Sequence, residues 1–173
     1  MNANYSIFLG LYLACLLVRS SYEVLKKSGR VNPGNKGLFA VVFTAMCTLW
    51  LSWFAMCPSD PLPLVVPDPV RWTGLGIVII GLGLAVEALV KLRGLENIDH
   101  LITTGIFSKL RHPMYTGFLS WIVGWSTYHG ALVSFLVGLV GIGNILYWRR
   151  LEDMNLELQY GEIYSGYRKR TWF

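Results

Sequence analysis

The chain has few charged residues for its length. Asp, Glu, Lys and Arg make up 14% of its 173 residues, whereas a soluble domain usually carries about a quarter. Hydrophobic residues make up 54%, and the mean hydropathy is +0.47. This composition argues against a soluble protein and is typical of an integral membrane protein. The length predicts a single domain, residues 1–173.

Cysteine is also scarce, and this bears on metal and redox chemistry. Cys15, Cys47 and Cys57 lie in or beside apolar runs, without the spacing of metal ligands. We therefore expect no metal site and interpret the cysteines as small packing residues. The first apolar run also lacks a basic flank and a small-residue cleavage pattern, so we expect no cleavable signal peptide.

Four long apolar runs are present, at 5–18, 38–57, 72–90 and 113–148. A helix needs about 20 residues to cross a bilayer. The last run holds no Asp, Glu, Lys or Arg and is too long for one crossing, and Ser-Thr-Tyr-His-Gly at 126–130 predicts a break within it. The sequence therefore predicts an all-α polytopic membrane helix bundle with five transmembrane helices, the last two a tight hairpin of short helices.

The basic residues are concentrated in three segments. Residues 19–36, 91–111 and the tail from 149 hold five, four and five of them, which is 14 of the 15 Lys and Arg. By the positive-inside rule these segments are cytoplasmic, which places the N-terminus outside and the C-terminus inside. We expect a prokaryotic inner membrane as the host. The net charge of +5 then reports topology and an attraction to membrane lipid, and we expect no nucleic-acid partner.

Proline and glycine predict where the chain bends and packs. Residues 58–69 hold five of the seven prolines, which predicts an extended outer loop over the bundle mouth. Residues 1–70 therefore form an N-terminal part that consists of two spans and this loop. Residues 71–173 are expected to form the functional core of the domain. Glycines near the third and in the last span permit close helix contact: Gly74, Gly76, Gly81, Gly83, Gly138, Gly141 and Gly143.

A polar motif, Arg-His-Pro-Met-Tyr-Thr-Gly at 111–117, directly precedes the longest apolar run. Pro113 suits the first position of a helix, and Arg111 could be a simple cytoplasmic anchor. However, the spacing of His112 and Tyr115 places an imidazole and a phenol on one helical face. Upstream, Gly105 permits a close backbone approach to a ligand. The motif is therefore a candidate binding site.

Acidic residues near the ends of two spans have two interpretations each. Glu152 could pair with Arg149 on a solvated helix, in which Leu151, Met154 and Leu158 form the apolar stripe of a C-terminal cytoplasmic amphipathic helix. Alternatively, Glu152 and Asp153 could face a cationic ligand. Similarly, Glu87 could pair with Lys91, four residues on, or serve as a pocket carboxylate.

Taken in order, these motifs resemble the isoprenylcysteine carboxyl methyltransferase family. The resemblance runs from 99 to 170 and rests on Leu-Ile-Thr-Thr-Gly-Ile-Phe at 101–107, the motif at 111–117, the hairpin, the acidic pair at 152–153, and the tyrosines of the tail at 160, 164 and 167. Phospholipid N-methyltransferases share much of this region. The first two spans carry no motif.

The resemblance implies a membrane methyltransferase that binds S-adenosyl-L-methionine at its cytoplasmic face. By position, the implied catalytic residues are Arg149 and Glu152, and the implied cofactor-binding residues are Leu101, Gly105, Arg111, His112, Pro113, Tyr115, Glu152 and Asp153. The chain departs from the family pattern at several points. Asp99, followed by His100, replaces a His, Asp153 shortens a Glu, and the usual Pro-Arg ending is absent. A family Arg falls on Trp148, so either Arg149 or Arg150 fills its role.

The expected acceptor is lipophilic and enters from the bilayer. The resemblance favours carboxyl O-methylation of an isoprenylcysteine-like substrate. The alternatives are a phospholipid or other small-molecule methyltransferase, a nicotinamide-dependent membrane reductase, and a non-enzymatic membrane scaffold. We expect a lateral opening for the substrate near Glu87, Met114, Phe118 and Leu146.

Overall fold

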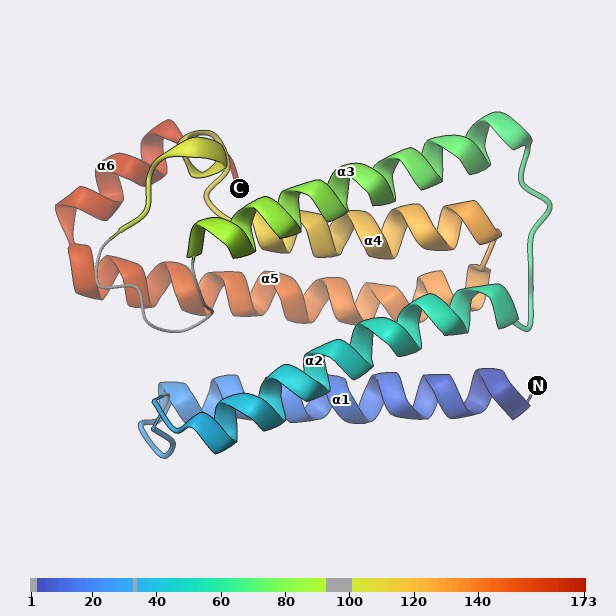
Figure 1. The fold of residues 1–173 in the computed structure, drawn as a ribbon, viewed down its shortest axis with the longest axis horizontal. Helices are drawn as coiled ribbons and strands as arrows, with labels where there is room; N and C mark the ends of the chain where they lie inside the picture. Colours follow the sequence, from blue (N-terminus) through green and yellow to red (C-terminus); the bar gives the residue numbers. More distant parts are fainter. Residues whose placement is uncertain (1–2, 33, 93–100) are drawn as a thin grey trace.

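The computed structural model describes residues 3–32, 34–92 and 101–173. All regular elements in these residues are helices, in agreement with the predicted all-α class (Figure 1). The α-helices are α1 (Ala3–Lys27), α2 (Lys36–Met56), α3 (Asp68–Leu92), α4 (Pro113–His129), α5 (Leu132–Tyr160) and α6 (Glu162–Arg170). Two short 3₁₀ helices, η1 (Cys57–Ser59) and η2 (Gly105–Ser108), follow α2 and precede α4.

Four of the helices are long and apolar enough to cross a membrane: α1, α2 extended through η1, α3 and α5. The helix α4 has 17 residues, which at about 1.5 Å per residue is slightly less than a bilayer core. A fifth span therefore stays a prediction. The expectation of two short hairpin helices is wrong for α5, which has 29 residues. Good helix formers follow Trp148, and no Gly or Pro interrupts them before Gly161.

Glycines bring α3 and α4 into close contact along their length, and the two helices lie side by side (Figure 1). A Cβ atom on Gly117 would lie 2.5 Å from the Gly81 carbonyl oxygen, and one on Gly124 would lie 2.5 Å from that of Gly74. By contrast, a Cβ on Gly83 would have open space. Only some of the predicted glycines therefore serve helix packing.

The core lies between α1, α2, α4 and α5 and is rich in aromatic side chains. Trp53 and Tyr12 are almost fully buried, and their ring centroids are 5.4 Å apart. Two glycines of α5 make room for them: a Cβ on Gly138 would meet the Trp53 ring at 2.6 Å, and one on Gly141 would meet the Tyr12 hydroxyl at 2.2 Å. Small residues on α5 thus fit large ones on its neighbours.

The proline-rich connection between α2 and α3 crosses the turn between α4 and α5. The amide of Leu64 donates to the carbonyl of Gly130, which ends α4 in a left-handed conformation (φ 63°). The buried Asp60 carboxylate accepts from the amide (2.7 Å) and the hydroxyl (2.6 Å) of Ser134. Since the first amides of a helix lack partners within it, Asp60 stabilises the start of α5.

At the opposite end, Gly161 (φ 52°) separates α5 from α6, and α6 folds back toward the start of α4 (Figure 1). Of the predicted apolar stripe, Leu151 is buried, whereas Met154 and Leu158 are 43% and 86% exposed. The α6 residues Tyr164 and Tyr167 are buried instead. The amphipathic cytoplasmic helix stays a prediction, because the exposed part of its stripe does not pack against the described residues.

Candidate active site

The site is centred on Asp153, which lies in the last third of α5. Its Oδ1 atom lies 2.6 Å from Nε2 of His112 and 3.2 Å from Nε of Arg111. The three side chains are at most 10% exposed. His112 immediately precedes Pro113, the first residue of α4. The predicted motif at the start of α4 and the predicted acidic pair are therefore in direct contact.

Residues of α6 complete the surroundings of this carboxylate. The hydroxyl of Tyr164 donates a hydrogen bond to Oδ1 of Asp153. Burial of the phenol is the main cause that raises the pKa of Tyr164 well above its ordinary value, and the hydrogen bond from its hydroxyl to Asp153 is the second. The phenol therefore keeps its proton and acts as a donor. An ionised carboxylate only accepts hydrogen bonds, so His112 carries a proton on Nε2.

The loop before α4 is held in place by the end of the chain. The Tyr167 hydroxyl donates to the carbonyl of Phe107 (2.6 Å), and Nη1 of Arg111 donates to the carbonyl of Arg168 (3.3 Å). The amide of Arg111 also donates to the carbonyl of Trp172 (2.9 Å). These contacts fix Arg111 and His112 next to α5, even though more than 40 residues separate them from Asp153 in the sequence.

Glu152 and Arg149 lie around this buried cluster and are more accessible. The Glu152 side chain is 48% exposed, and its Oε2 lies 3.7 Å from Nδ1 of His112. The ring centroids of His112 and Tyr115 are 5.5 Å apart. Arg149 lies with Nε 3.8 Å from Oδ2 of Asp153. The site therefore combines an accessible carboxylate, an aromatic ring and a guanidinium.

A family model for phospholipid methyltransferases matches residues 69–163, more than half of the chain. The chain belongs to this family. A protein-S-isoprenylcysteine O-methyltransferase of Schizosaccharomyces pombe is 35% identical over 78 residues, which are 44% of this chain and 33% of that protein. A methanethiol S-methyltransferase of Pseudomonas deceptionensis is 30% identical over 143 residues, covering 76% of this chain and 54% of that protein.

The chain therefore spans about a third to a half of the length of these two curated relatives. No solved structure matches it. The resemblance to isoprenylcysteine methyltransferases expected from the motifs is confirmed at the level of the family. The matched range of this phospholipid methyltransferase family member includes α4 and all of α5, and with them the cluster around Asp153.

The structure distinguishes the two arginines that could fill the family role. Arg149 contacts Asp153, whereas Arg150 is exposed and forms no ion pair within 4.0 Å in the described part of the chain. The motif departure at Asp99 and His100 lies outside the described residues. Leu101 is half-buried at the start of the segment leading to η2, and it has no recorded contact with the Asp153 cluster.

Gly105, the first residue of η2, lies against the end of α3. A Cβ on Gly105 (φ 65°) would lie 3.0 Å from Cε of Lys91 and 3.7 Å from Oε1 of Glu87. Neither side chain forms an ion pair within 4.0 Å among residues 3–32, 34–92 and 101–173, so the predicted local pair is not formed in this structure. Glu87 is exposed and stays available as a pocket carboxylate.

The remaining residues predicted to line a lateral opening have different environments. Phe118 is only 8% exposed, and its ring lies 4.8 Å from that of Trp50 in the core. Met114 packs against the same core, whereas Leu146 is 42% exposed. Met114 and Phe118 belong to the packed core, whereas Glu87 and Leu146 are exposed, so the lateral opening stays a prediction.

A contact from α1 also lies near the site and was not predicted from the sequence. Arg19, in the first basic segment, forms an ion pair with Glu23, and its guanidinium carbon lies 5.1 Å from the Trp148 ring centroid. The hydroxyl of Ser20 donates to Oδ1 of Asn144 (2.9 Å). Together these contacts hold α1 against α5 one turn before Glu152. The four-residue spacing of Arg19 and Glu23 was the available signal.

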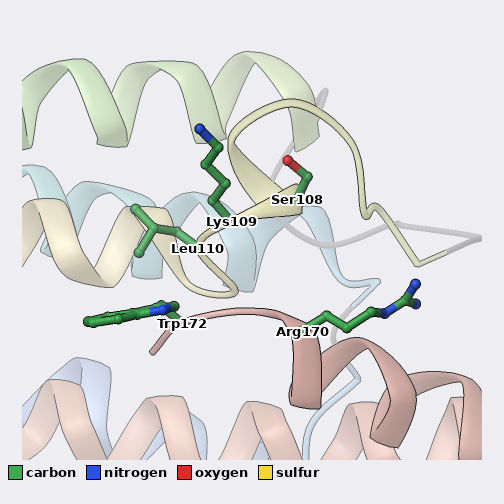
Figure 2. Close-up of a pocket in the computed structure, with 5 residues that line it drawn as sticks. All are labelled: Ser108, Lys109, Leu110, Arg170 and Trp172. Atoms are coloured by element: carbon green, nitrogen blue, oxygen red, sulfur yellow. The ribbon is translucent and has the colours of Figure 1, made fainter.

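A surface cavity of about 380 Å³ lies beside the site and is lined by Ser108, Lys109, Leu110, Arg170 and Trp172 (Figure 2). The side chains of Lys109 and Arg170 point away from each other (Figure 2). None of the predicted site residues lines this cavity. The cavity lies where the loop before α4 meets the segment 171–173, next to the backbone bridge between Leu110 and Trp172.

Proposed function

We propose that this member of the phospholipid methyltransferase family transfers a methyl group from S-adenosyl-L-methionine to a lipophilic, membrane-held acceptor. The observation that carries the proposal is the contact of Arg111 and His112 with Asp153, beside the accessible Glu152. This cluster lies within the region that matches the family. Both relatives are methyltransferases by name. With five spans and the C-terminus inside, the site would face the cytoplasm, in a prokaryotic inner membrane.

The residues present fit this cofactor. S-adenosyl-L-methionine carries a sulfonium, an ammonium and a carboxylate group. Glu152 offers a half-exposed carboxylate, and Tyr115 offers an aromatic face, both of which suit a cation. Arg149 offers a guanidinium whose buried Nε has no hydrogen-bond partner among the described residues. Asp153 is already occupied by its protein donors, so its role is to hold His112 and Arg111 in place.

The proposed reaction is O-methylation of an isoprenylcysteine-like carboxylate. When bound, the cofactor supplies an electrophilic methyl group. A carboxylate acceptor needs no base, because it carries its negative charge at neutral pH. The protein then has only to bind and align the two reactants, and no general base is required. Arg149 is available for a carboxylate, and the Asp153 network keeps His112 and Arg111 fixed.

A second candidate acceptor is a small apolar thiol. It is favoured by the longer match to the methanethiol S-methyltransferase, which covers 76% of this chain. A thiol must lose its proton before attack, since the thiolate is the nucleophile. In this case the half-exposed Glu152 is the nearest carboxylate able to accept that proton. The two candidates therefore assign Glu152 different roles.

Titration calorimetry of the protein in detergent with S-adenosyl-L-methionine tests the cofactor assignment. Glu152→Gln should weaken binding by more than about 1 kcal/mol, the scale of one charge-assisted hydrogen bond. Glu157→Gln is the matched control, because Glu157 is on the same helix, is about half exposed, and contacts only Arg168 and Ser165 among the described polar side chains. Unchanged affinity in Glu152→Gln would mean that Glu152 is simply solvated.

Radiolabelled methyl transfer on whole membranes tests the acceptor. Label in extracted protein would support a prenylated-protein carboxylate, label in phospholipid would support headgroup methylation, and a volatile labelled product would support a thiol. Binding of NADPH in place of S-adenosyl-L-methionine would instead support a reductase. Binding of neither, with no labelled product, would favour a scaffold.

A further inference from the structure

The guanidinium of Arg149 lies over an aromatic ring that no family motif includes. Its Cζ atom lies 4.2 Å from the centroid of the Phe173 ring. Phe173 lies beyond the residues that match the family, 69–163. The distance is well within the range of about 6 Å for a cation–π contact. Phe173 is therefore the aromatic partner of a residue predicted to be catalytic.

The backbone around Phe173 places its ring independently of Arg149. The amide of Trp172 donates to the carbonyl of Lys109 (2.8 Å), and the carbonyl of Trp172 accepts from the amide of Arg111 (2.9 Å). The hydroxyl of Thr171 donates to the carbonyl of Tyr167 (2.9 Å). Residues 171 and 172 are thus attached both to the loop before α4 and to α6, which fixes the backbone that leads to Phe173.

The contact with the Phe173 ring uses none of the N–H groups of Arg149 as hydrogen-bond donors, and its Nε has no hydrogen-bond partner among the described residues. An aromatic ring covers the face of a guanidinium, while the N–H donors point outward in its plane and can grip a carboxylate with two hydrogen bonds. The nearest protein carboxylate is that of Asp153, and its Oδ1 atom already accepts hydrogen bonds from His112 and Tyr164. Arg149 reaches only its Oδ2, at 3.8 Å, which is too long for a hydrogen bond.

We propose that Phe173 is a positioning residue that holds the Arg149 guanidinium so that its free edge binds a ligand carboxylate. The inference rests on the proposed function. Two sources can supply that carboxylate, the amino-acid end of S-adenosyl-L-methionine and the acceptor. Phe173 itself does not contact the carboxylate but fixes the plane in which Arg149 meets it.

The test compares Phe173→Leu, which keeps an apolar side chain but removes the aromatic face, with Phe173→Trp, which keeps the face. Trp172→Leu is the matched control, because the Trp172 side chain is 81% exposed and only its backbone holds the segment. Affinities for S-adenosyl-L-methionine and for its decarboxylated analogue are measured by calorimetry. The KM and kcat for N-acetyl-S-farnesylcysteine, a carboxylate acceptor, are measured with saturating cofactor.

If the cofactor supplies the carboxylate, Phe173→Leu should weaken the binding of S-adenosyl-L-methionine by about three- to tenfold, the scale of a cation–π contact. The affinity for the decarboxylated analogue should stay unchanged. If the acceptor supplies it, the cofactor affinity should hold while the KM rises by a similar factor and kcat stays constant. In either case Phe173→Trp should keep the affected cofactor affinity or acceptor KM within about twofold of the wild-type value. In an Arg149→Met background, Phe173→Leu should have no further effect.

Equally weakened binding of the cofactor and of its decarboxylated analogue would overturn the inference, since the effect would not involve a carboxylate. The same holds if Phe173→Leu behaves like Trp172→Leu, or if Phe173→Trp fails to restore binding. These outcomes leave the proposed function intact, because the wild-type protein still binds S-adenosyl-L-methionine. A wild-type protein that binds neither cofactor form would overturn the proposed function and this inference together.

Discussion

Asp153→Asn should destabilise the folded protein far more than the same type of change at its neighbour, Glu152→Gln. Asp153 is the only carboxylate within 4.0 Å of Arg111 in the described chain, and it also receives His112 and Tyr164. The substitution keeps the shape of the side chain but removes its charge. It leaves the Arg111 guanidinium, whose side chain is 6% exposed, without a counter-charge.

The magnitude follows from burial. Breaking a buried ion pair by removing one partner costs about 3–5 kcal/mol, and Arg111 keeps its hydrogen bond to the Arg168 carbonyl, so we expect about 3 kcal/mol. For a domain of this size, each kcal/mol lowers Tm by about 2–4 °C, which gives a decrease of about 6–12 °C. Glu152 is 48% exposed and 3.7 Å from His112, so Glu152→Gln should cost less than about 1 kcal/mol.

Thermal unfolding in detergent without added ligand measures both values under one condition. The two acids are adjacent and on the same helix, so differences in expression or detergent affect both variants alike. Calorimetric titration then separates stability from binding, because Glu152→Gln should lower cofactor affinity while unfolding near the wild-type temperature. If Asp153→Asn lowered Tm no more than Glu152→Gln, the buried cluster would not be a structural unit and the reasoning would be wrong.

Three further predictions concern packing, topology and the acceptor. Gly117→Ala should destabilise the protein by about 1–3 kcal/mol, because its Cβ would lie 2.5 Å from the Gly81 carbonyl oxygen. Gly83→Ala, in open space, should leave the free energy of unfolding at or above the wild-type value, and chemical denaturation compares the two variants. In a background without the native cysteines, Ser28→Cys and Val65→Cys should react with a membrane-impermeant thiol reagent from opposite sides of the membrane, because the charge distribution places 19–36 inside and the connection after α2 outside. Labelling of both positions from one side would contradict the topology. Acceptor affinity should rise with alkyl chain length by up to about 0.8 kcal/mol per buried methylene while cofactor affinity stays constant, and equally efficient methylation of tail-less acceptors would contradict lateral entry.

The sequence predicted the helices well where local signals were strong. The apolar runs correspond to α1, α2 and α3, Pro113 marks the start of α4, and Gly130 ends it. The expected last span and the expected amphipathic helix after Trp148 form one continuous helix, α5, in the structure. Charge ends a membrane span, but Arg, Glu and Leu are good helix formers and continue the helix to Tyr160.

Contacts between distant segments were out of reach of sequence reasoning. Asp60 belongs to a proline-rich loop, and nothing local indicates that its carboxylate binds the start of α5, more than 70 residues later. Phe173 likewise carries no motif and meets Arg149 only because residues 109–111 hold the end of the chain. Such pairs depend on how the helices are arranged, which no local pattern encodes.

The sequence by itself determined that the chain is a helical membrane protein of this methyltransferase family, because hydrophobic run length and motif order are local properties. The tertiary structure decided which residue of each adjacent pair points into the buried cluster and which is more accessible. Successive residues on a helix point about 100° apart, so Asp153 faces Arg111 and His112 while Glu152 is half exposed. For the same reason Arg149 approaches Asp153 and Arg150 is exposed. Only the rotation of α5 against α4 and α6 sets which of these directions is the inner one.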